Sequence, residues 1–506
     1  MESLKLGQKE LTLEEVREVA DFGRKVELSS HAVRRVERAH AFLIRESKKG
    51  EAVYGLNTGF GPLSDVRIAN EDIEQLQYNF LRSHAVGVGD YIDDRYVRAM
   101  LLLRANALAI GNSGVSLAVI EQLLAFLNRG LCPMIPAQGS VGASGDLAPL
   151  AHLALCLIGE GRARVKGREM SGKQALKLAG LKPVRLGAKE GLALTNGTQF
   201  MTAHGTLNLL EAEYLCDVAD AAGAMSVEAL RGTVTAFSPE IHRVRAHPGQ
   251  VKSAENVRRI LMHGRQKSEI AKSHENCGKI QDPYSIRCIP QVHGASRDAI
   301  AWVRQVLERE INSVTDNPLV FPASKQILSG GNFHGQIVAM AMDFLAIAAA
   351  ELGSISEIRL DKLMNPAFSS LPIFLTRQSG LNSGFMIVQY AAASIVSENK
   401  TLCHPAVVDS IPTSVEKEDH VSMGAWGARK CMRVVENTRK VLAMELAAAC
   451  QAIDLLRPLR SSEPIERIHK QVRKHVHRLD ADRSMHEDLK AIDRMIAERE
   501  FGDILG

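Results

Sequence analysis

The first part of the chain arranges apolar and polar residues at a helical period. Thr12-Leu-Glu-Glu15 has the form of a capping box, in which the side chains of Thr12 and Glu15 each bond a free amide at a helix start. Apolar residues then recur on one face of the expected helix: Leu13, Val16, Val19 and Ala20. The same period predicts three further helices: 31–45, 95–110 and 116–128.

Further along the chain, the helical segments become longer and richer in alanine. Four such helices are expected: 201–230, 336–364, 384–402 and 423–456. Alanine has the highest helix propensity, and long helices usually form bundles whose apolar faces can extend across subunits. Strand patterns are scarce, with candidates at 162–165 and 319–321. We expect a mainly α-helical protein with a loop-rich N-terminal part (1–203) and a long-helix bundle followed by C-terminal helices (204–506).

Composition narrows the functions that this helical protein could have. Among 506 residues, 62 Lys and Arg against 58 Asp and Glu give a net charge of +4, which is too weak to indicate a nucleic-acid partner. The most apolar stretch, around 337–355, is interrupted by Asp343 and Glu351, so we expect no membrane span. With no apolar leader after Met1 and no Cys-x-x-Cys pair among eight cysteines, we expect a cytoplasmic protein with reduced thiols.

Common motifs for nucleotide and metal chemistry are incomplete. The segment from Gly167 to Lys173 has the spacing of a phosphate-binding P-loop, but Gln174 follows where a Ser or Thr hydroxyl would bind Mg²⁺. His475 and His477 are two residues apart and lie on different sides of a helix, so they are a poor pair of metal ligands. We therefore expect no metal site.

A glycine-rich segment gives the first specific indication of chemistry. Three glycines recur at every third residue before an apolar helix start: Gly139, Gly142 and Gly145. A loop that enters a helix N-terminus gathers unpaired amides and positive potential. Spacing alone favours the simpler interpretation, which is a tight helix entry that uses glycine for positive φ angles.

The run from Gly139 to His152, which contains Ala143-Ser144-Gly145-Asp146, resembles the signature of the aromatic amino acid lyase family. Five further segments resemble motifs of that family, in the family's order: 54–61, 194–199, 281–287, 330–335 and 418–423. The resemblance covers most of the chain, roughly residues 10–480. It implies a mainly α-helical long-helix bundle of the aspartase/fumarase-like type, with the reactive group on the loop-rich N-terminal part.

In this family the Ala-Ser-Gly tripeptide cyclises by itself. The resemblance implies that the Gly145 nitrogen attacks the Ala143 carbonyl carbon and that two waters leave. The product is a 4-methylidene-imidazol-5-one (MIO) ring, whose methylidene comes from Ser144. No external cofactor is then expected, because the chain makes the electrophile that its nucleophilic side chains cannot supply. The family uses this group to remove ammonia from an α-amino acid and leave an α,β-unsaturated acid.

The resemblance also assigns roles to individual residues. It implies that Tyr54 is the base that takes the β-proton of the substrate, and that the guanidinium of Arg287 binds the substrate carboxylate. Asn196 and Tyr284 are expected beside the MIO ring, where they bond the ring and the substrate. Gln281 is expected to be a weaker neighbour of the same ring.

Substrate choice is expected to depend on His84 and Glu418. Glu418 resembles the acid that histidine-specific members direct at the substrate, and His84 stands where phenylalanine-specific members carry an apolar residue. A carboxylate and an imidazole suit a polar imidazole substrate and would be costly to desolvate against a phenyl ring. Phe333, near the ring, and Met386, in the pocket, are further candidates, with ordinary core packing as the alternative for both.

These residues together predict histidine-specific deamination, in which L-histidine gives trans-urocanate and ammonia as the first step of histidine degradation. The resemblance implies a homotetramer in which several chains build each active site. One departure is that Glu416 and Lys417 differ from the residues that histidine-type relatives often carry there. The alternatives are a tyrosine or phenylalanine ammonia-lyase or aminomutase of the same family, a fumarase/aspartase-like lyase without MIO, and a non-catalytic helical scaffold.

Overall fold

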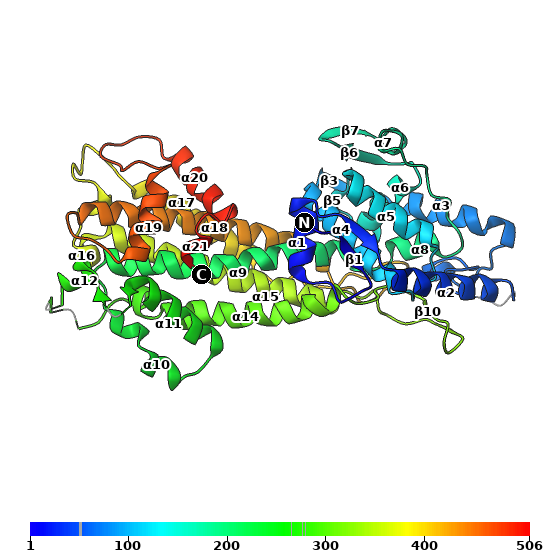
Figure 1. The fold of residues 1–506 in the computed structure, drawn as a ribbon, viewed down its shortest axis with the longest axis horizontal. Helices are drawn as coiled ribbons and strands as arrows, with labels where there is room; N and C mark the ends of the chain where they lie inside the picture. The colour runs from blue at the N-terminus through cyan, green and yellow to red at the C-terminus, as the bar shows by residue number, and fades with distance from the viewer. Residues whose placement is uncertain (50–52, 265, 276, 279, 506) are drawn as a thin grey trace. The chain divides into compact units, whose positions relative to one another are not determined.

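The computed structural model describes residues 1–49, 53–264, 266–275, 277–278 and 280–505. These residues form two compact units, which are described separately. Unit 1 comprises Met1–Leu210, Arg304–Asp343 and Pro405–Arg429. Unit 2 comprises Glu211–Val303, Phe344–His404 and Lys430–Gly506. Four of the five boundaries between the units fall inside long helices (Figure 1): α9 (Gln199–Ala229), α14 (Ile289–Glu310), α15 (Gln336–Met364) and α18 (Gly424–Leu455). The fifth lies between His404 and Pro405, in the loop after α17.

Unit 1 contains the loop-rich part of the chain, in which helices alternate with small sheets. Its further helices are α1 (Leu13–Phe22), α2 (Ser30–Ser47), α3 (Ile73–His84), α4 (Asp94–Ala109), α5 (Leu117–Arg129), α6 (Leu147–Leu157), α7 (Gly172–Ala179) and α8 (Glu190–Thr195), with 3₁₀ turns η1 (Gly61–Leu63) and η2 (Asn70–Asp72). Its strands are β1 (Leu4–Leu6), β2 (Val26–Leu28), β3 (Val88–Tyr91), β4 (Leu131–Pro133), β5 (Pro136–Gln138), β6 (Arg162–Val165), β7 (Arg168–Ser171), β10 (Leu319–Phe321) and β11 (Gln326–Leu328). Strand β1 pairs in parallel with β2, whereas β3–β5, β4–β6–β7 and β10–β11 are antiparallel.

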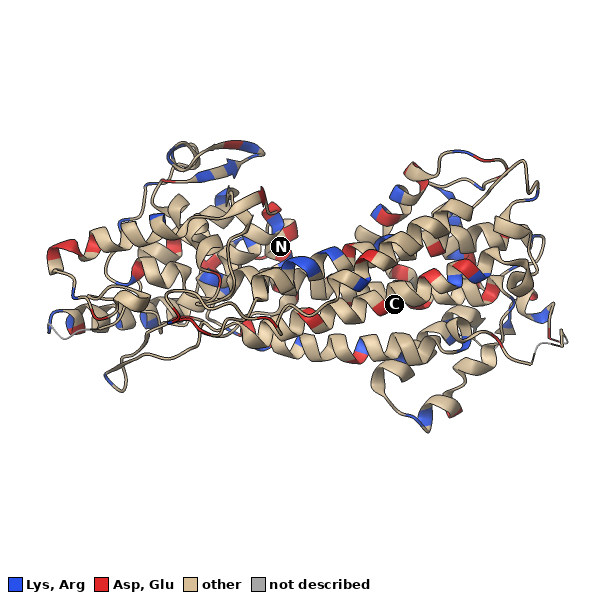
Figure 2. Cartoon of the chain, turned by 180° about the vertical axis from the view of Figure 1, so that it is seen from behind, with Lys and Arg blue, Asp and Glu red and all other residues tan. Residues whose placement is uncertain are grey.

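Unit 2 is built mainly from long helices. Its further helices are α10 (Pro239–Arg243), α11 (Pro248–Leu261), α12 (Glu269–Lys272), α13 (Tyr284–Arg287), α16 (Pro366–Ser369), α17 (Met386–Leu402), α19 (Glu463–Arg473), α20 (His486–Ala497) and α21 (Gly502–Leu505), with 3₁₀ turns η3 (Val234–Phe237) and η4 (Ile373–Leu375). Its strands β8 (Met262–His263) and β9 (Gln266–Lys267) pair antiparallel. Lys, Arg, Asp and Glu are interspersed along the helices of both units (Figure 2).

The structure confirms the mainly helical fold and the local signals behind it. Thr12 and Glu15 form the expected capping box, and Gly130 ends α5 in the left-handed conformation with φ +67°. The helices expected from the sequence start and end within two residues of the observed ones. The later start of α17 has a local cause, because Gly384 has φ +56° and a residue in that conformation cannot continue an α-helix. Helix α17 therefore starts two residues later than expected.

Helix α15 is long and apolar enough to cross a membrane by length and composition alone. However, 61% of its most apolar stretch is buried inside the protein. Its buried Asp343 accepts a hydrogen bond from the backbone N–H of Val407 at 2.8 Å. A buried carboxylate that is paired within the protein is typical of a core helix.

Candidate active site

The Gly139–Asp146 loop joins strand β5 to helix α6 and makes two turns that require glycine. Gly142 and Gly145 have φ angles of +72° and +74°. A Cβ on Gly142 would lie 2.2 Å from the Ser422 hydroxyl, and a Cβ on Gly145 would lie 2.3 Å from the carbonyl oxygen of Gly197. Both distances are far below van der Waals contact, so no other residue fits at either position. The spacing of glycines in the sequence thus reflects a tightly held turn.

Asp146 anchors the end of this loop. Its backbone N–H donates to Gly197 O at 2.7 Å, and its Oδ2 accepts from the backbone N–H groups of Phe200 and Met201 at 3.0 Å each. These amides belong to the first turn of α9, so Asp146 caps a helix that is distant in sequence. Burial raises the pKa of Asp146 to about 7, against the effect of the two amides.

A carboxylate lies directly beside the tripeptide. The Ser144 hydroxyl donates to Glu418 Oε1 at 3.0 Å, and the Thr413 hydroxyl donates to Glu418 Oε2 at 2.9 Å. Ala143 packs against a small apolar cluster that contains Val421 and Met423. The loop therefore has an apolar wall on one side and a fixed carboxylate on the other.

His84 ends helix α3 in the same unit. Its ring packs on Phe80 with centroids 3.9 Å apart, and its Nδ1 lies 2.8 Å from Phe80 O. Burial lowers the pKa of His84, while the Phe80 carbonyl and the Glu418 charge oppose this shift. The two residues expected to select the substrate thus interact electrostatically and lie with Ser144 in one unit.

Tyr54 and Phe333 lie in loops of unit 1. The Tyr54 hydroxyl accepts a hydrogen bond from the backbone N–H of Gly61 at 3.2 Å, and its ring meets Phe60 edge-on. Phe333 is half-buried in the loop before α15. The hydrogen bond from Gly61 fixes the position of the Tyr54 hydroxyl.

Asn196 follows α8 and presents an unused side-chain oxygen. The residue is 4% exposed, and its Oδ1 has no hydrogen-bond partner among the described residues. Its backbone carbonyl is held by Arg104, which donates from Nη1 at 3.1 Å. A buried amide oxygen without a partner is costly, so it is suited to bonding a ligand.

The remaining expected site residues belong to unit 2. The guanidinium of Arg287 stacks over the ring of Tyr284 at 4.6 Å on α13, and Tyr284 is 71% exposed. Arg287 Nε is buried without a hydrogen-bond partner among the described residues. Met386 is half-buried at the first position of α17. Unit 2 thus presents a cation and a phenol that are only partly used by the chain itself.

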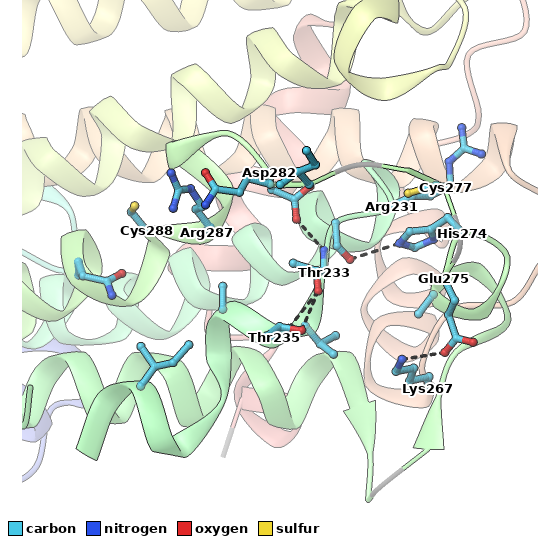
Figure 3. Close-up of a pocket in the computed structure, with 18 residues that line it drawn as sticks. Arg231, Thr233, Thr235, Lys267, His274, Glu275, Cys277, Asp282, Arg287 and Cys288 are labelled. Carbon is cyan, nitrogen blue, oxygen red and sulfur yellow. Dashed lines mark hydrogen bonds and ion pairs between the residues drawn. The ribbon is translucent and has the colours of Figure 1, made fainter. Parts of the chain in front are cut away.

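Gln281 and Arg287 line a cavity of about 680 Å³ within unit 2. In this cavity, Asp282 accepts from the backbone N–H of Thr233 at 2.7 Å, and Lys267 pairs with Glu275 at 2.7 Å (Figure 3). Both lining carboxylates are therefore already bonded. Arg287 Nε, by contrast, has no hydrogen-bond partner within the described residues.

Comparison with known proteins agrees with this arrangement. A sequence profile described as "Aromatic amino acid lyase" matches residues 11–474. The chain belongs to the aromatic amino acid lyase family. It is 52% identical to the histidine ammonia-lyase of Anaeromyxobacter dehalogenans (strain 2CP-C), over 98% of this chain and 99% of that one.

Solved structures of aromatic amino acid lyase relatives share the fold. Histidine ammonia-lyase from Trypanosoma cruzi is 43% identical with a TM-score of 0.92, covering 99% of this chain and 95% of that one. Tyrosine aminomutase from Streptomyces globisporus is 35% identical with a TM-score of 0.93, covering 99% and 98%. These relatives confirm the fold class that the sequence predicted.

The aromatic amino acid lyase family is known for the MIO group, and the residues present fit it. Ala143, Ser144 and Gly145 form a turn whose glycine cannot be replaced. The buried Asn196 Oδ1 has no partner among the described residues. No group of three or more His, Cys, Asp or Glu side chains that could hold a metal ion occurs in the described part of the chain.

Two contributors to this aromatic amino acid lyase site were not found from the sequence. Arg104, which is 0% exposed on α4, holds the Asn196 carbonyl. Glu310 accepts a hydrogen bond from the Thr198 hydroxyl at the end of α14, and burial raises the pKa of Glu310. The signal for Arg104 was an arginine inside an otherwise apolar helix, Ala99–Ala109, where a charged residue is unusual.

Proposed function

We propose that this protein is a histidine ammonia-lyase, which converts L-histidine to trans-urocanate and ammonia. The observation that carries the proposal is the carboxylate of Glu418, which lies 3.0 Å from the Ser144 hydroxyl, with His84 nearby. A histidine side chain can bond both groups, whereas a phenyl ring would leave them desolvated and unpaired. Relatives that are about half identical over nearly the whole chain and carry the name histidine ammonia-lyase support the same substrate.

We further propose that Ala143, Ser144 and Gly145 form MIO without an external cofactor. The group supplies an electrophile for a reaction in which ammonia is a poor leaving group. The tight turn at Gly142 and Gly145 supports this proposal, because it brings the reacting backbone atoms into a fixed geometry. Asn196, with its unpaired Oδ1, would bond this group or the substrate beside it.

The remaining residues are proposed to bind the substrate and move its proton. Tyr54 would accept the β-proton, and the Gly61 amide that donates to its oxygen supports charge there. Arg287 would bind the carboxylate through its free donors, with Tyr284 and Gln281 beside it. Phe333 and Met386 would supply apolar walls.

We propose a cytoplasmic homotetramer with active sites to which several chains contribute. Large apolar side chains are exposed on one face of α15 and on α17: Phe344, Ile347, Ile358, Ile387 and Tyr390. Several exposed large apolar side chains on long helices are typical of an interface. The exposed Tyr284 and the unused donor of Arg287 are further surfaces that a second chain could cover.

One pair of measurements tests the proposal. Purified protein is incubated separately with L-histidine, L-tyrosine and L-phenylalanine, and the absorbance of the unsaturated product is followed. Urocanate should form fastest, and the intact mass should be lower than the sequence mass by two waters. Faster coumarate or cinnamate formation would assign the chain to a tyrosine or phenylalanine enzyme of the same family. An unmodified mass in active protein would exclude MIO.

A further inference from the structure

Arg104 is a buried cation whose guanidinium the chain uses only in part. Its side chain is 0% exposed on α4, and its Nε and Nη2 atoms have no hydrogen-bond partner among the described residues. Burial lowers the pKa of Arg104 to about 10, with the charge of Asp316 opposing the shift, so the group is cationic at neutral pH. A buried cation with unused donors costs stability. Its presence therefore points to a task other than holding the fold.

The remaining guanidinium nitrogen of Arg104, Nη1, makes three hydrogen bonds to the segments beside the tripeptide. Nη1 donates to Asn196 O at 3.1 Å, to Gln199 Oε1 at 2.8 Å and to Thr315 O at 3.1 Å. Gln199 Nε2 in turn donates to the Thr315 hydroxyl at 2.8 Å. Arg104 thus fastens both ends of the segment 196–199. A Cβ on Gly197 would lie 2.3 Å from Nη1, so glycine is what allows this close approach.

The peptide carbonyl of Gly197 lies against the end of the tripeptide, at Gly145 and Asp146. Its oxygen accepts from the backbone N–H of Asp146 at 2.7 Å, and Gly145 and Gly197 pair as an isolated bridge. A Cβ on Gly145 would lie 2.3 Å from that same oxygen. Gly145 therefore packs directly against the Gly197 peptide. The hydrogen bonds from Arg104 hold that peptide in place.

We propose that Arg104 is a positioning residue for the cyclisation of Ala143, Ser144 and Gly145, an inference that rests on the proposed function. In this step the Gly145 nitrogen bonds to the Ala143 carbonyl carbon. The carbonyl oxygen leaves as water with the amide hydrogens of Ser144 and Gly145. The Ser144 hydroxyl leaves as a second water with its α-hydrogen, and no oxidant is consumed. Loosening the Gly197 peptide slows the step, because the nitrogen reaches the carbonyl carbon only in a fixed turn.

The test follows the loss of two waters by intact mass in the folded fraction of freshly made protein. Arg104→Met removes the guanidinium group together with its charge. The rate at which the two waters are lost should then become at least about tenfold slower. Arg104→Lys keeps a charge, but its ammonium ends one bond short of the position of Nη1 and lacks the planar guanidinium, so its rate should be intermediate. Arg98→Met is the matched control, because Arg98 is half-buried on the same helix and donates to the carbonyls of Val19 and Ala20.

Each outcome of this experiment either supports or overturns the proposed role of Arg104. A folded Arg104→Met that loses both waters as fast as the parent would overturn the proposal, as would equal slowing in Arg98→Met. If Arg104→Met gives no folded protein, Arg104→Lys decides, since a parental rate of water loss in that variant overturns the proposal as well. A parent chain that keeps both waters would instead contradict the proposed function, so the two failures are distinguishable.

Discussion

Two buried carboxylates of unit 2, those of Glu445 and Asp220, accept hydrogen bonds at both oxygens, whereas buried polar groups around the tripeptide in unit 1 keep atoms without a partner among the described residues. In unit 2, Arg359 donates to both oxygens of Glu445 at 2.6 and 2.8 Å, and the hydroxyls of Ser226 and Ser356 donate to the same carboxylate at 2.6 Å. In unit 1, by contrast, Arg104 keeps two unpartnered nitrogens within the described structure, as stated above. The chain therefore supplies all the hydrogen bonds that the buried Glu445 carboxylate needs, but only part of those that the Arg104 guanidinium can make.

A second buried carboxylate of unit 2, that of Asp220, is bonded in the same way as that of Glu445. Asp220 accepts from His293 Nδ1 at 2.8 Å, from Arg297 at 2.6 Å and from the Ser253 hydroxyl at 2.6 Å. Around the tripeptide, Asp146 Oδ1 and Asn196 Oδ1 are buried without a partner among the described residues. Unmet bonding capacity of this kind is expected where a ligand or a reaction will use it.

The largest effect is expected from a substitution at Ser144 in unit 1, which should change catalytic activity but not stability. Ser144→Ala removes the hydroxyl that must leave for the methylidene to form, so turnover of L-histidine should fall by about three orders of magnitude or more, the scale seen when a covalent catalyst is lost. The unfolding curve should stay close to that of the parent, because Ser144 contributes one partly buried hydrogen bond. Unchanged turnover in this variant would reject the MIO assignment.

The converse effect is expected in unit 2. Arg359→Met leaves the Glu445 charge buried without its cation, which should lower the free energy of unfolding by about 3–5 kcal/mol. Arg433→Met is the control, since the Arg433–Glu398 pair is 3.4 Å apart and nearly half exposed, and it should cost at most about 1 kcal/mol. Equal losses in the two variants, measured by urea unfolding, would contradict the contrast between paired and unpaired charge.

A smaller effect is expected for substrate choice. Glu418→Gln keeps the shape but removes the charge, so kcat/KM for L-histidine should fall about ten- to a hundredfold, the value of a charged hydrogen bond. Glu416→Gln, two residues away and exposed, should leave kcat/KM unchanged. Intact mass must be measured in parallel, because Glu418 also accepts the Ser144 hydroxyl. An equal fall for L-histidine and L-phenylalanine in fully dehydrated protein would show that Glu418 does not select the substrate.

Much of the fold could be predicted because it depends on local signals. The Thr12 cap, the Gly130 terminus and the alanine-rich helices are each encoded by neighbouring residues. The start of α9 lies two residues before the expected one, and no neighbouring residue signals it, since its first turn is capped by Asp146, which is more than 50 residues away. Met423 likewise has φ +54°, which delays the start of α18 and has no local signal.

The candidate site could be predicted only as far as motifs and resemblance reach. Tyr54, Glu418 and the tripeptide stand in recognisable segments, whereas Arg104 acts through contacts with residues 92 and 211 positions away. Such pairings follow from the packing of helices and not from spacing along the chain. The division of the chain into 1–203 and 204–506 stays a prediction, as do the roles of the individual site residues.

The last expected effect is in pH dependence, where the buried aspartates of the two units should behave in opposite ways. Burial raises the pKa of Asp146 to about 7, so the folded state holds a proton there that the unfolded chain releases near pH 4. The contribution of Asp146 to stability therefore falls as pH rises from about 4 to about 7, by at most about 1.4 kcal/mol per pH unit. Asp146→Asn should become more stable relative to the parent across this interval.

Asp220 is the buried aspartate of unit 2 with which Asp146 is compared. Burial raises the pKa of Asp220, but the Arg297 charge and the hydrogen bond from His293 outweigh it and hold the pKa below its usual value. The contribution of Asp220 is therefore present above about pH 4 and is lost as pH falls through the lower folded pKa. The deficit of Asp220→Asn should stay constant above pH 4 and shrink below it in urea unfolding. Parallel pH profiles for the two asparagine variants would show that both units treat buried charge alike.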